Sequence, residues 1–141
     1  MNVLGVVLDS HLKFTDHIDN ALSSGAQSMY DLNMLKSHGM RKAELSNVCR
    51  ATLISKLTYA SPSWWGFVSV ADKARMNSLV SKAIKWGLYE QSMPSIFEIC
   101  EKADETLFGS VMNNSEHVLH QFLPPRQTHN YALRARPHDR Q

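Results

Sequence analysis

The side chains that could do chemistry in this chain are few and scattered. His117 and His120 form an H-x-x-H pair, and this spacing would place two imidazoles on one face of a helix, where they could ligate a metal ion. A metal site needs further ligands, and the nearest candidate, Cys100, is distant in sequence. We therefore interpret the pair as part of a helix surface and predict no metal site.

Asp16 and His17 are the other adjacent pair that could transfer protons. Their position at the start of a helical pattern favours a cap beside a first-turn residue over a catalytic dyad. The chain has no Gly-rich phosphate loop, no G-x-S-x-G elbow and no H-E-x-x-H motif. It also lacks closely spaced aspartates after an apolar strand, as a two-metal polymerase centre would require. The sequence thus predicts no catalytic residue.

Charge is the stronger signal, because it is segregated along the chain. Residues 36–85 carry nine Lys or Arg against two acids, a net charge of +7, whereas residues 86–120 have a net charge of −5. A basic block of this density indicates a polyanion partner, and the alternative is an ordinary solvated helix surface. Arg75, Lys82 and Lys85 recur at helical spacing and are our candidate nucleic-acid-binding cations.

The helix that would position these cations runs from about residue 70 to residue 87. Ser69 and Asp72 have the spacing of an N-terminal cap. In such a cap the hydroxyl and the carboxylate each accept a hydrogen bond from a backbone N–H that has no partner within the helix. The residues at three- and four-residue steps gather on one apolar face, which we expect to pack into the core. They are Met76, Leu79, Val80, Ala83, Ile84 and Gly87.

Two helices are predicted before it. Thr15 or Asp16 should cap the first, and Gly39 should end it by supplying a left-handed position. Small residues in its middle, such as Gly25, imply close approach by a neighbouring helix. The second should run from about residue 42 to residue 60 and stop before Pro62.

The flanking segments are shorter or less regular. Residues 3–8 read as a strand and 12–14 as a returning strand, and Gly5 indicates a bulge or a close approach to the backbone. The pair Trp64-Trp65 favours a packed corner of the core over a ligand platform. Residues 96–111 predict an acidic amphipathic helix, whose charge would let it dock on the basic block. A short helix should follow at 116–122, and from Arg126 the tail is basic and expected to be mobile.

Length and composition set the broad class. The 141 residues, 43% of them hydrophobic, correspond to one domain or part of one. No apolar run approaches the roughly 20 residues of a membrane helix, and the N-terminal apolar run lacks the flank and length of a signal peptide. Cys49 and Cys100 fall in helical patterns, so we predict free buried thiols and an intracellular, reducing compartment.

The expected fold is mainly α. We predict a short N-terminal strand or hairpin at 1–14, a three-helix bundle at 15–89, a helical extension at 90–125 and a basic tail at 126–141.

Three stretches carry a resemblance to a known family. They are LGVVLDSHLKFTDHI from Leu4, LISKLTYASPSWWG from Leu53 and SLVSKAIKWG from Ser78, and the ending NYALRARPHDR from Asn130 adds to them. In this order and spacing they resemble the C-terminal part of the reverse transcriptase of a non-long-terminal-repeat retrotransposon, of the jockey-like or LINE-like kind. They are spread along the chain from residue 4 to residue 140.

The resemblance implies that Leu4 and Gly5 belong to a hairpin that holds the primer terminus. The three helices would be the thumb, which lies against the template–primer duplex. The palm, with its aspartates and magnesium, would lie upstream of Met1, so the chain would be a fragment without a cofactor of its own. It is expected to be inactive alone, with the duplex and the missing palm and fingers as its partners.

The rival interpretation comes from another class of protein. The chain would be a small helical protein-interaction module with no nucleic-acid role, binding a partner through its acidic fourth helix and the Trp64-Trp65 corner. Salt dependence separates the two, because phosphate binding weakens steeply with salt and an apolar interface does not.

Overall fold

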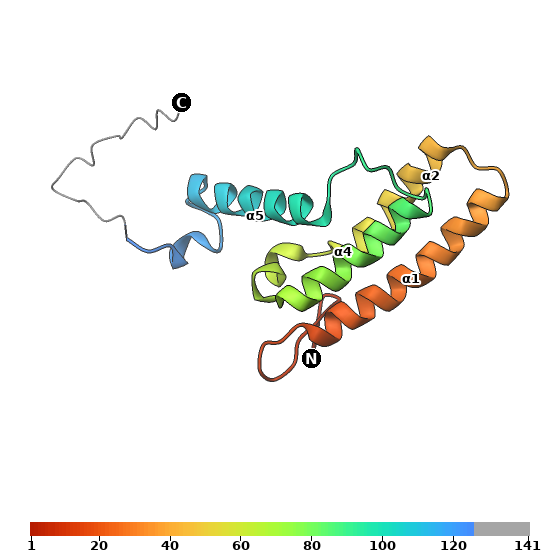
Figure 1. The fold of residues 1–141 in the computed structure, drawn as a ribbon. Coiled ribbons are helices and arrows are strands. Elements are labelled where there is room, and N and C mark those ends of the chain that lie inside the picture. The colour runs from red at the N-terminus through yellow and green to blue at the C-terminus, as the bar shows by residue number, and fades with distance from the viewer. Residues whose placement is uncertain (126–141) are drawn as a thin grey trace, which may run out of the picture. The chain divides into compact units, whose positions relative to one another are not determined.

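The computed structural model describes residues 1–125, which form a mainly helical structure with a short N-terminal hairpin (Figure 1). The predicted fold class is confirmed at this level, and the predicted tail, 126–141, lies outside the described residues. The elements are β1 (Asn2–Val3), β2 (Val6–Val7), α1 (Thr15–Ser37), α2 (Lys42–Cys49), a π-helical segment (Arg50–Ile54), α3 (Ser55–Leu57), α4 (Val70–Lys85) and α5 (Ile96–Asn113). Short 3-10 turns occupy Ser61–Ser63, Trp65–Phe67 and His120–Phe122.

The hairpin is tighter than predicted. β1 and β2 pair antiparallel, with Val3 opposite Val6, so residues 3–8 do not form one strand. Leu4 and Gly5 have φ values of 49° and 87°, the conformation of a two-residue turn that matches strand twist. Gly5 therefore lies in a turn and not in a bulge. A Cβ there would lie 3.4 Å from Cε1 of Tyr59, an ordinary van der Waals distance, so the positive φ and not a close approach favours glycine at this position.

The predicted strand at 12–14 is wrong, and Asp9 shows why. One of its carboxylate oxygens, Oδ1, accepts hydrogen bonds of 2.7 Å from the backbone N–H groups of both His11 and Lys13. These bonds fold the segment into a tight loop in which Leu12 has a φ of 57°. A side chain that takes backbone donors in this way competes with strand pairing.

Helix α1 begins without a side-chain cap and ends as predicted. Phe14 occupies the N-cap position and makes no capping hydrogen bond, so the expected cap by Thr15 or Asp16 is wrong. At the other end Gly39 has a φ of 87°. The N–H of Gly39 donates to the carbonyl of Lys36, and that of Met40 donates to the carbonyl of Leu35. This pair of bonds is the Schellman motif.

The second predicted helix is interrupted by the π-helical segment. Its buried residues Leu45, Cys49, Leu53 and Leu57 recur every four residues, and such a row drifts by about 40° per step around a regular α-helix. The wider π-turns absorb this drift and keep the row facing the core. By their spacing, Arg50 and Lys56 fall near this apolar row, and both are exposed. Regular helix ends at Leu57, earlier than the predicted residue 60.

Helix α4 begins at the predicted cap, but it ends at Lys85, so Gly87 lies in a left-handed turn and not on the predicted apolar face. The hydroxyl of Ser69 accepts a 3.1 Å hydrogen bond from the N–H of Asp72 and donates one of 2.8 Å to the Asp72 carboxylate. After the helix, Gly87 has a φ of 70°, and the N–H of Leu88 donates to the carbonyl of Ala83. Leu88 is fully buried, so this second Schellman end fixes the chain to the core.

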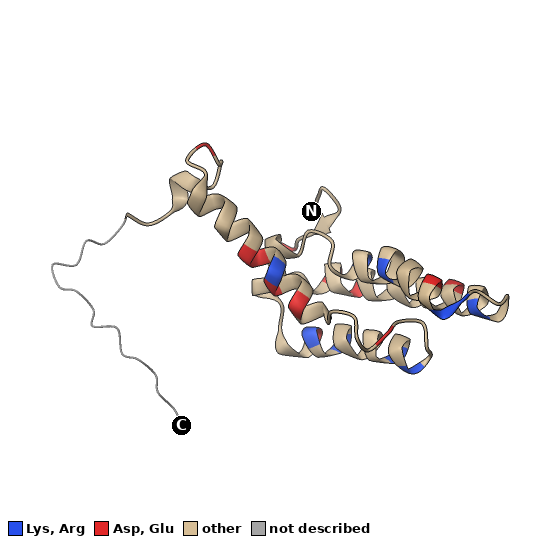
Figure 2. Cartoon of the chain, turned by 90° about the horizontal axis from the view of Figure 1, so that it is seen from above, with Lys and Arg blue, Asp and Glu red and all other residues tan. Residues whose placement is uncertain are grey.

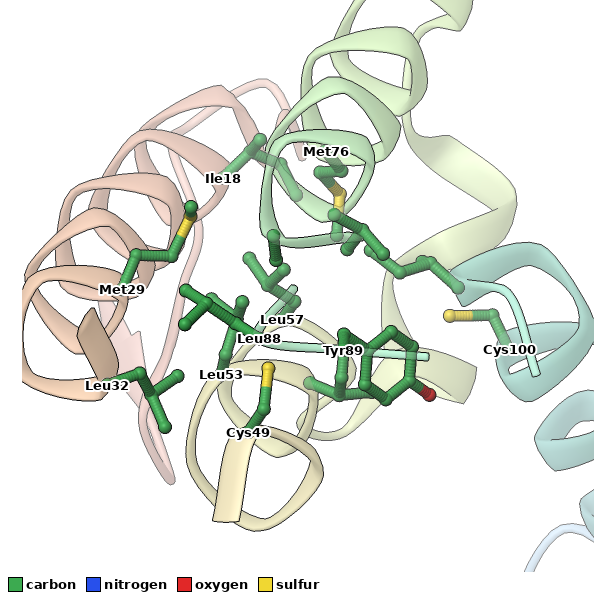
Figure 3. Packing of buried hydrophobic residues seen from close by; sticks show 14 of the residues in the cluster. Ile18, Met29, Leu32, Cys49, Leu53, Leu57, Met76, Leu88, Tyr89 and Cys100 are labelled. Carbon is green, nitrogen blue, oxygen red and sulfur yellow. The ribbon is translucent and has the colours of Figure 1, made fainter. Parts of the chain in front are cut away.

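The helices approach one another closely at Gly25 in the middle of α1. A Cβ on this residue would lie 2.9 Å from Cδ2 of Leu79 on α4 and 3.0 Å from Cδ1 of Leu53 in the π-helical segment. The predicted close approach is therefore confirmed. Figure 3 shows part of the core, in which buried side chains converge from α1 (Ile18, Met29), from residues 53–57 (Leu53, Leu57) and from α4 (Met76). Of the predicted face of α4, Leu79 and Ile84 are only partly buried and pack against the core.

The tryptophan pair is a packed corner, as predicted. Trp64 and Trp65 are both buried, and the indole N–H of Trp64 donates a 2.8 Å hydrogen bond to the carbonyl of Tyr59. Trp65 contacts Phe97 of α5 edge-on, with ring centroids 5.4 Å apart. Within residues 1–125 no ion pair joins α5 to the basic helices, so the contacts that dock the start of α5 are apolar.

Helix α5 confirms the predicted acidic helix and begins with a capping box. The Ser95 hydroxyl accepts from the N–H of Glu98, and the Glu98 carboxylate accepts from the N–H of Ser95. The two cysteines are free and buried, as predicted.

The chain divides into two compact units, Met1–Phe108 and the residues from Gly109 onward. In the second unit a 3-10 turn, His120–Phe122, replaces the predicted helix at 116–122. The side chains of Asn114 and His117 accept hydrogen bonds from the backbone N–H groups of Glu116 and Leu119. These local bonds take donors that a helix would have used.

We predict that Gly25→Ala lowers the free energy of unfolding by about 1–3 kcal/mol, the usual cost of overpacking a core. In a Leu79→Ala background the cost should be smaller, because the obstructing Cδ2 atom is gone. Urea unfolding of the four proteins of this cycle measures both values. An equal cost in both backgrounds, or a gain of the ~0.5–1 kcal/mol that Ala has over Gly in an open helix, would contradict the close approach.

Candidate nucleic-acid interface

Lys82 and Lys85 lie in the last turn of α4, on the side opposite the buried residues Met76, Val80 and Ala83. Both lysines are exposed, and in residues 1–125 neither is paired with an acid. Figure 2 shows the basic residues of α4 on the ribbon. The capped, amphipathic helix thus presents two unneutralised cations to solvent.

Arg75, the third predicted cation of α4, has a different environment. Its Nη2 lies 2.6 Å from Oδ1 of Asp19 on α1, and its Nη1 lies 2.9 Å from Oδ1 of Asp72. The hydrogen bond that Arg75 donates to Asp19, followed by the one that it donates to Asp72, raises the pKa of the guanidinium. Arg75 therefore joins the start of α4 to α1, and two carboxylates compensate its charge.

A third lysine, Lys36 of α1, contacts the end of α4, and sequence spacing does not indicate this contact. The ammonium of Lys36, in the last turn of α1, donates a 2.6 Å hydrogen bond to the carbonyl of Trp86, the C-cap residue of α4. Cations are favoured at helix C-termini by the orphan carbonyls and the helix dipole. Lys36, Lys82 and Lys85, which we call the C-terminal lysines, therefore lie where α1 and α4 end together. Only the pairing of these two helices reveals the set.

Two aromatic rings beside these lysines were also missed by the sequence analysis. Trp86 is 39% exposed, with the Lys82 ammonium 4.8 Å from its ring centroid. Tyr30 of α1 is 67% exposed. Together with Lys82 and Asn33 they line a hollow of about 250 Å³ between α1 and α4. The one sequence feature that could have indicated these rings is the position of Tyr30, directly beside the apolar stripe of α1.

Leu4 and Gly5 lie at the other end of α1. The hydroxyl of Tyr59 donates a 3.0 Å hydrogen bond to the carbonyl of Leu4. A cavity of about 580 Å³ lies between this hairpin, residues 17–24 of α1 and the segment 55–59. At 1.5 Å per residue it is separated from Lys36 by roughly 25 Å along the helix. The predicted site residues therefore form two groups rather than one.

His17 borders that cavity but is held in the core. Only 6% of the residue is exposed, its Nε2 has no hydrogen-bond partner, and its ring meets that of Trp64 edge-on at 5.2 Å. Burial lowers the pKa of the imidazole, which favours the neutral form. Asp16 is exposed and makes no hydrogen bond to His17, so the pair is not a dyad in this structure.

The described residues, 1–125, contain neither a metal-binding cluster nor a membrane-spanning helix. No three His, Cys, Asp or Glu side chains in this range are grouped so that they could hold a metal ion. Nδ1 of His120 lies 2.7 Å from the carbonyl of Val111, and Nδ1 of His117 accepts the N–H of Leu119. No helix in the same range has the length and apolar character to cross a membrane.

Comparison of the chain with protein-family models, with curated proteins and with solved structures found no match. The family resemblance therefore rests on the sequence stretches quoted above.

We predict that His17→Phe reduces the pH dependence of stability. The folded pKa of His17 is lowered, so below the ordinary value of about 6.5 the unfolded chain binds more protons than the folded one. Wild-type stability should be complete above that pH and fall as the pH drops through 6.5, and the variant should lose less. Urea unfolding between pH 8 and pH 5 measures the difference, in which the other six histidines cancel. Parallel curves for the two proteins would contradict the prediction.

We also predict that Tyr59→Phe loosens the hairpin without unfolding the helices. The variant keeps the ring against Gly5 but loses the hydrogen bond to Leu4, worth about 0.5–1.5 kcal/mol. Faster amide exchange at Leu8, whose N–H donates to the carbonyl of Met1 across the hairpin, would report the change. Tyr30→Phe is the matched control, since its hydroxyl makes no hydrogen bond within residues 1–125. Equal exchange in both variants would show that Tyr59 does not hold the hairpin.

Proposed function

We propose that this chain is the thumb region of an RNA-directed DNA polymerase of the non-long-terminal-repeat, jockey-like or LINE-like kind, separated from its palm. It contacts the template–primer duplex through phosphates and has no catalytic residue or metal of its own. The parent enzyme would use magnesium bound by aspartates of the palm. The partners are the duplex and the missing palm and fingers, in an intracellular compartment.

The observation that carries this proposal is the exposed pair Lys82 and Lys85 at the end of a well-packed helix. Phosphate contacts need cations that are free of acidic partners and held by a rigid element. Both lysines meet these conditions in residues 1–125, and Lys36 adds a third positive charge at the same end of α1. Arg75, paired with two acids, is a weaker candidate than its spacing suggested.

The position of the hairpin is compatible with the same assignment. The roughly 25 Å along α1 that separate the hairpin from the C-terminal lysines equal the rise of about seven base pairs at 3.4 Å each. One duplex could therefore follow α1, with its terminus at Leu4 and Gly5 and its backbone at the lysines. Each contact would be to the backbone, so we expect little sequence preference.

A protein-interaction module remains the second candidate, but on different residues. Trp64 and Trp65 are buried, so the tryptophan corner offers no docking surface. Exposed apolar side chains are instead found in the second unit, and they favour this reading. They are Met112, Val118, Leu119 and Phe122.

We predict that the full chain binds an RNA–DNA duplex weakly, with an affinity that falls as salt rises. The double change Lys82→Ala, Lys85→Ala should lower the slope of log affinity against log salt by about two units, one per lost phosphate contact. Arg75→Ala should change the slope less than either lysine, because Asp19 and Asp72 already neutralise the guanidinium. Fluorescence anisotropy of a labelled duplex across a salt series measures each slope.

Two controls make this test specific. Lys102→Ala removes an exposed lysine of α5 in the same unit and should leave the slope unchanged. Repeating the series with the tail arginines changed to Gln removes their contribution. These are Arg126, Arg134, Arg136 and Arg140. If the double lysine change leaves the salt slope unaltered both with and without the tail arginines, the proposal is overturned and the protein-interaction module is favoured.

A further inference from the structure

The hollow between α1 and α4 is lined by three kinds of side chain that can bind nucleic acids. Tyr30 supplies an exposed ring, Asn33 an amide and Lys82 a cation, and Trp86 forms one wall. Ala26, Met29 and Leu79 complete the lining, which contains no acid. Its volume of about 250 Å³ is below the roughly 300–1,000 Å³ of clefts that enclose a whole small molecule. The hollow therefore suits one ring that is attached to something larger.

Tyr30 is the ring that is free to take a ligand. The other aromatic residues of this unit are mostly occupied: Trp64, Trp65 and Tyr89 are buried, and Tyr59 holds the hairpin. Tyr30, in contrast, is 67% exposed, and its hydroxyl has no partner within residues 1–125. Bases of single strands stack on such rings with little sequence preference, because every base has a π-face.

Lys82 and Trp86 fix the rim of the hollow. The ammonium of Lys82 lies against the indole ring in a cation–π contact, and Lys36 holds the backbone carbonyl of Trp86. Lys82 therefore lines the same hollow as the ring of Tyr30, where a phosphate flanking a stacked base would pass. The amide of Asn33 can both donate to and accept from the edge of a base.

We propose that this hollow binds one unpaired nucleobase of a single-stranded nucleic acid, stacked on Tyr30, with the adjacent phosphates at Lys82 and Lys85. A base inside a duplex exposes neither face, so the ligand is a single strand or an unpaired end. The proposal deepens the proposed function and rests on it for a nucleic acid as the ligand.

The test compares two single strands that differ only in their bases. Oligothymidylate of twelve nucleotides and an abasic deoxyribose-phosphate strand of the same length carry the same phosphates. The full chain should bind the first more tightly, and Tyr30→Ala should weaken that binding by roughly 5- to 150-fold, the effect of one base–aromatic stack. The variant should leave the abasic strand, the duplex and the salt slope unaffected, as anisotropy titrations would show.

Two variants control for indirect effects. Tyr30→Phe keeps the ring and should keep the affinity for oligothymidylate. Phe67→Ala removes a ring that is 73% exposed and does not line the hollow, so it should change nothing. Equal affinity of the wild-type chain for the two strands would overturn the proposal, as would an equal loss on both strands in Tyr30→Ala.

The result also separates this proposal from the proposed function. If the double lysine change leaves the duplex salt slope intact while the effect of Tyr30 on oligothymidylate persists, the thumb assignment fails and the stacking site stands. If the lysines control the duplex slope and Tyr30→Ala has no effect on oligothymidylate, the stacking site alone fails.

Discussion

The absence of a side chain at Gly25 is the constraint on which the bundle depends. Leu79 of α4 and Leu53 of the π-helical segment both reach the space that a Cβ would occupy. Because interiors are packed at crystal-like density, this one position sets how closely α1 approaches both neighbours. Leu88, which follows the Schellman end at Gly87, belongs to the same buried core as Leu53.

The π-helical segment is the second device that the packing requires. A row of buried residues at strict four-residue steps cannot stay on one face of a regular helix. The wider turns at Arg50–Ile54 keep Leu53 and Leu57 in the core, while Lys56 stays exposed and donates a 2.8 Å hydrogen bond to the hydroxyl of Ser28 on α1. A sequence feature that looked like a conflict, basic residues near an apolar arc, is thereby resolved by a local change in helix geometry.

The functional surface follows from how the helix ends meet. Lys36 and Trp86 are fifty residues apart in sequence, yet their hydrogen bond brings the ends of α1 and α4 together. This contact places three lysines and two exposed rings beside one another, while pairing with Asp19 takes Arg75 out of the set. A cation is available to bind a phosphate only where no carboxylate already neutralises it. Whether a carboxylate lies close enough depends on how the helices pack.

Local signals were enough to predict much of the architecture. The helical class, the cap at Ser69, the left-handed end at Gly39 and the buried cysteines all depend on residues within a few positions of each other. Such features are fixed by backbone hydrogen bonding and periodicity, which the sequence expresses directly. The failures near residue 14 are also local, since Asp9 captures backbone donors that residue types alone did not reveal.

Tertiary structure decided the site. The partners of Arg75, the position of Lys36 against Trp86 and the hollow beside Tyr30 all join α1 to α4 across fifty or more residues. Sequence spacing orders residues around one helix but cannot say which carboxylate of another helix will face them. The sequence by itself therefore determined which faces are apolar and which are charged, and only the packing of α1 on α4 determined which charges remain free.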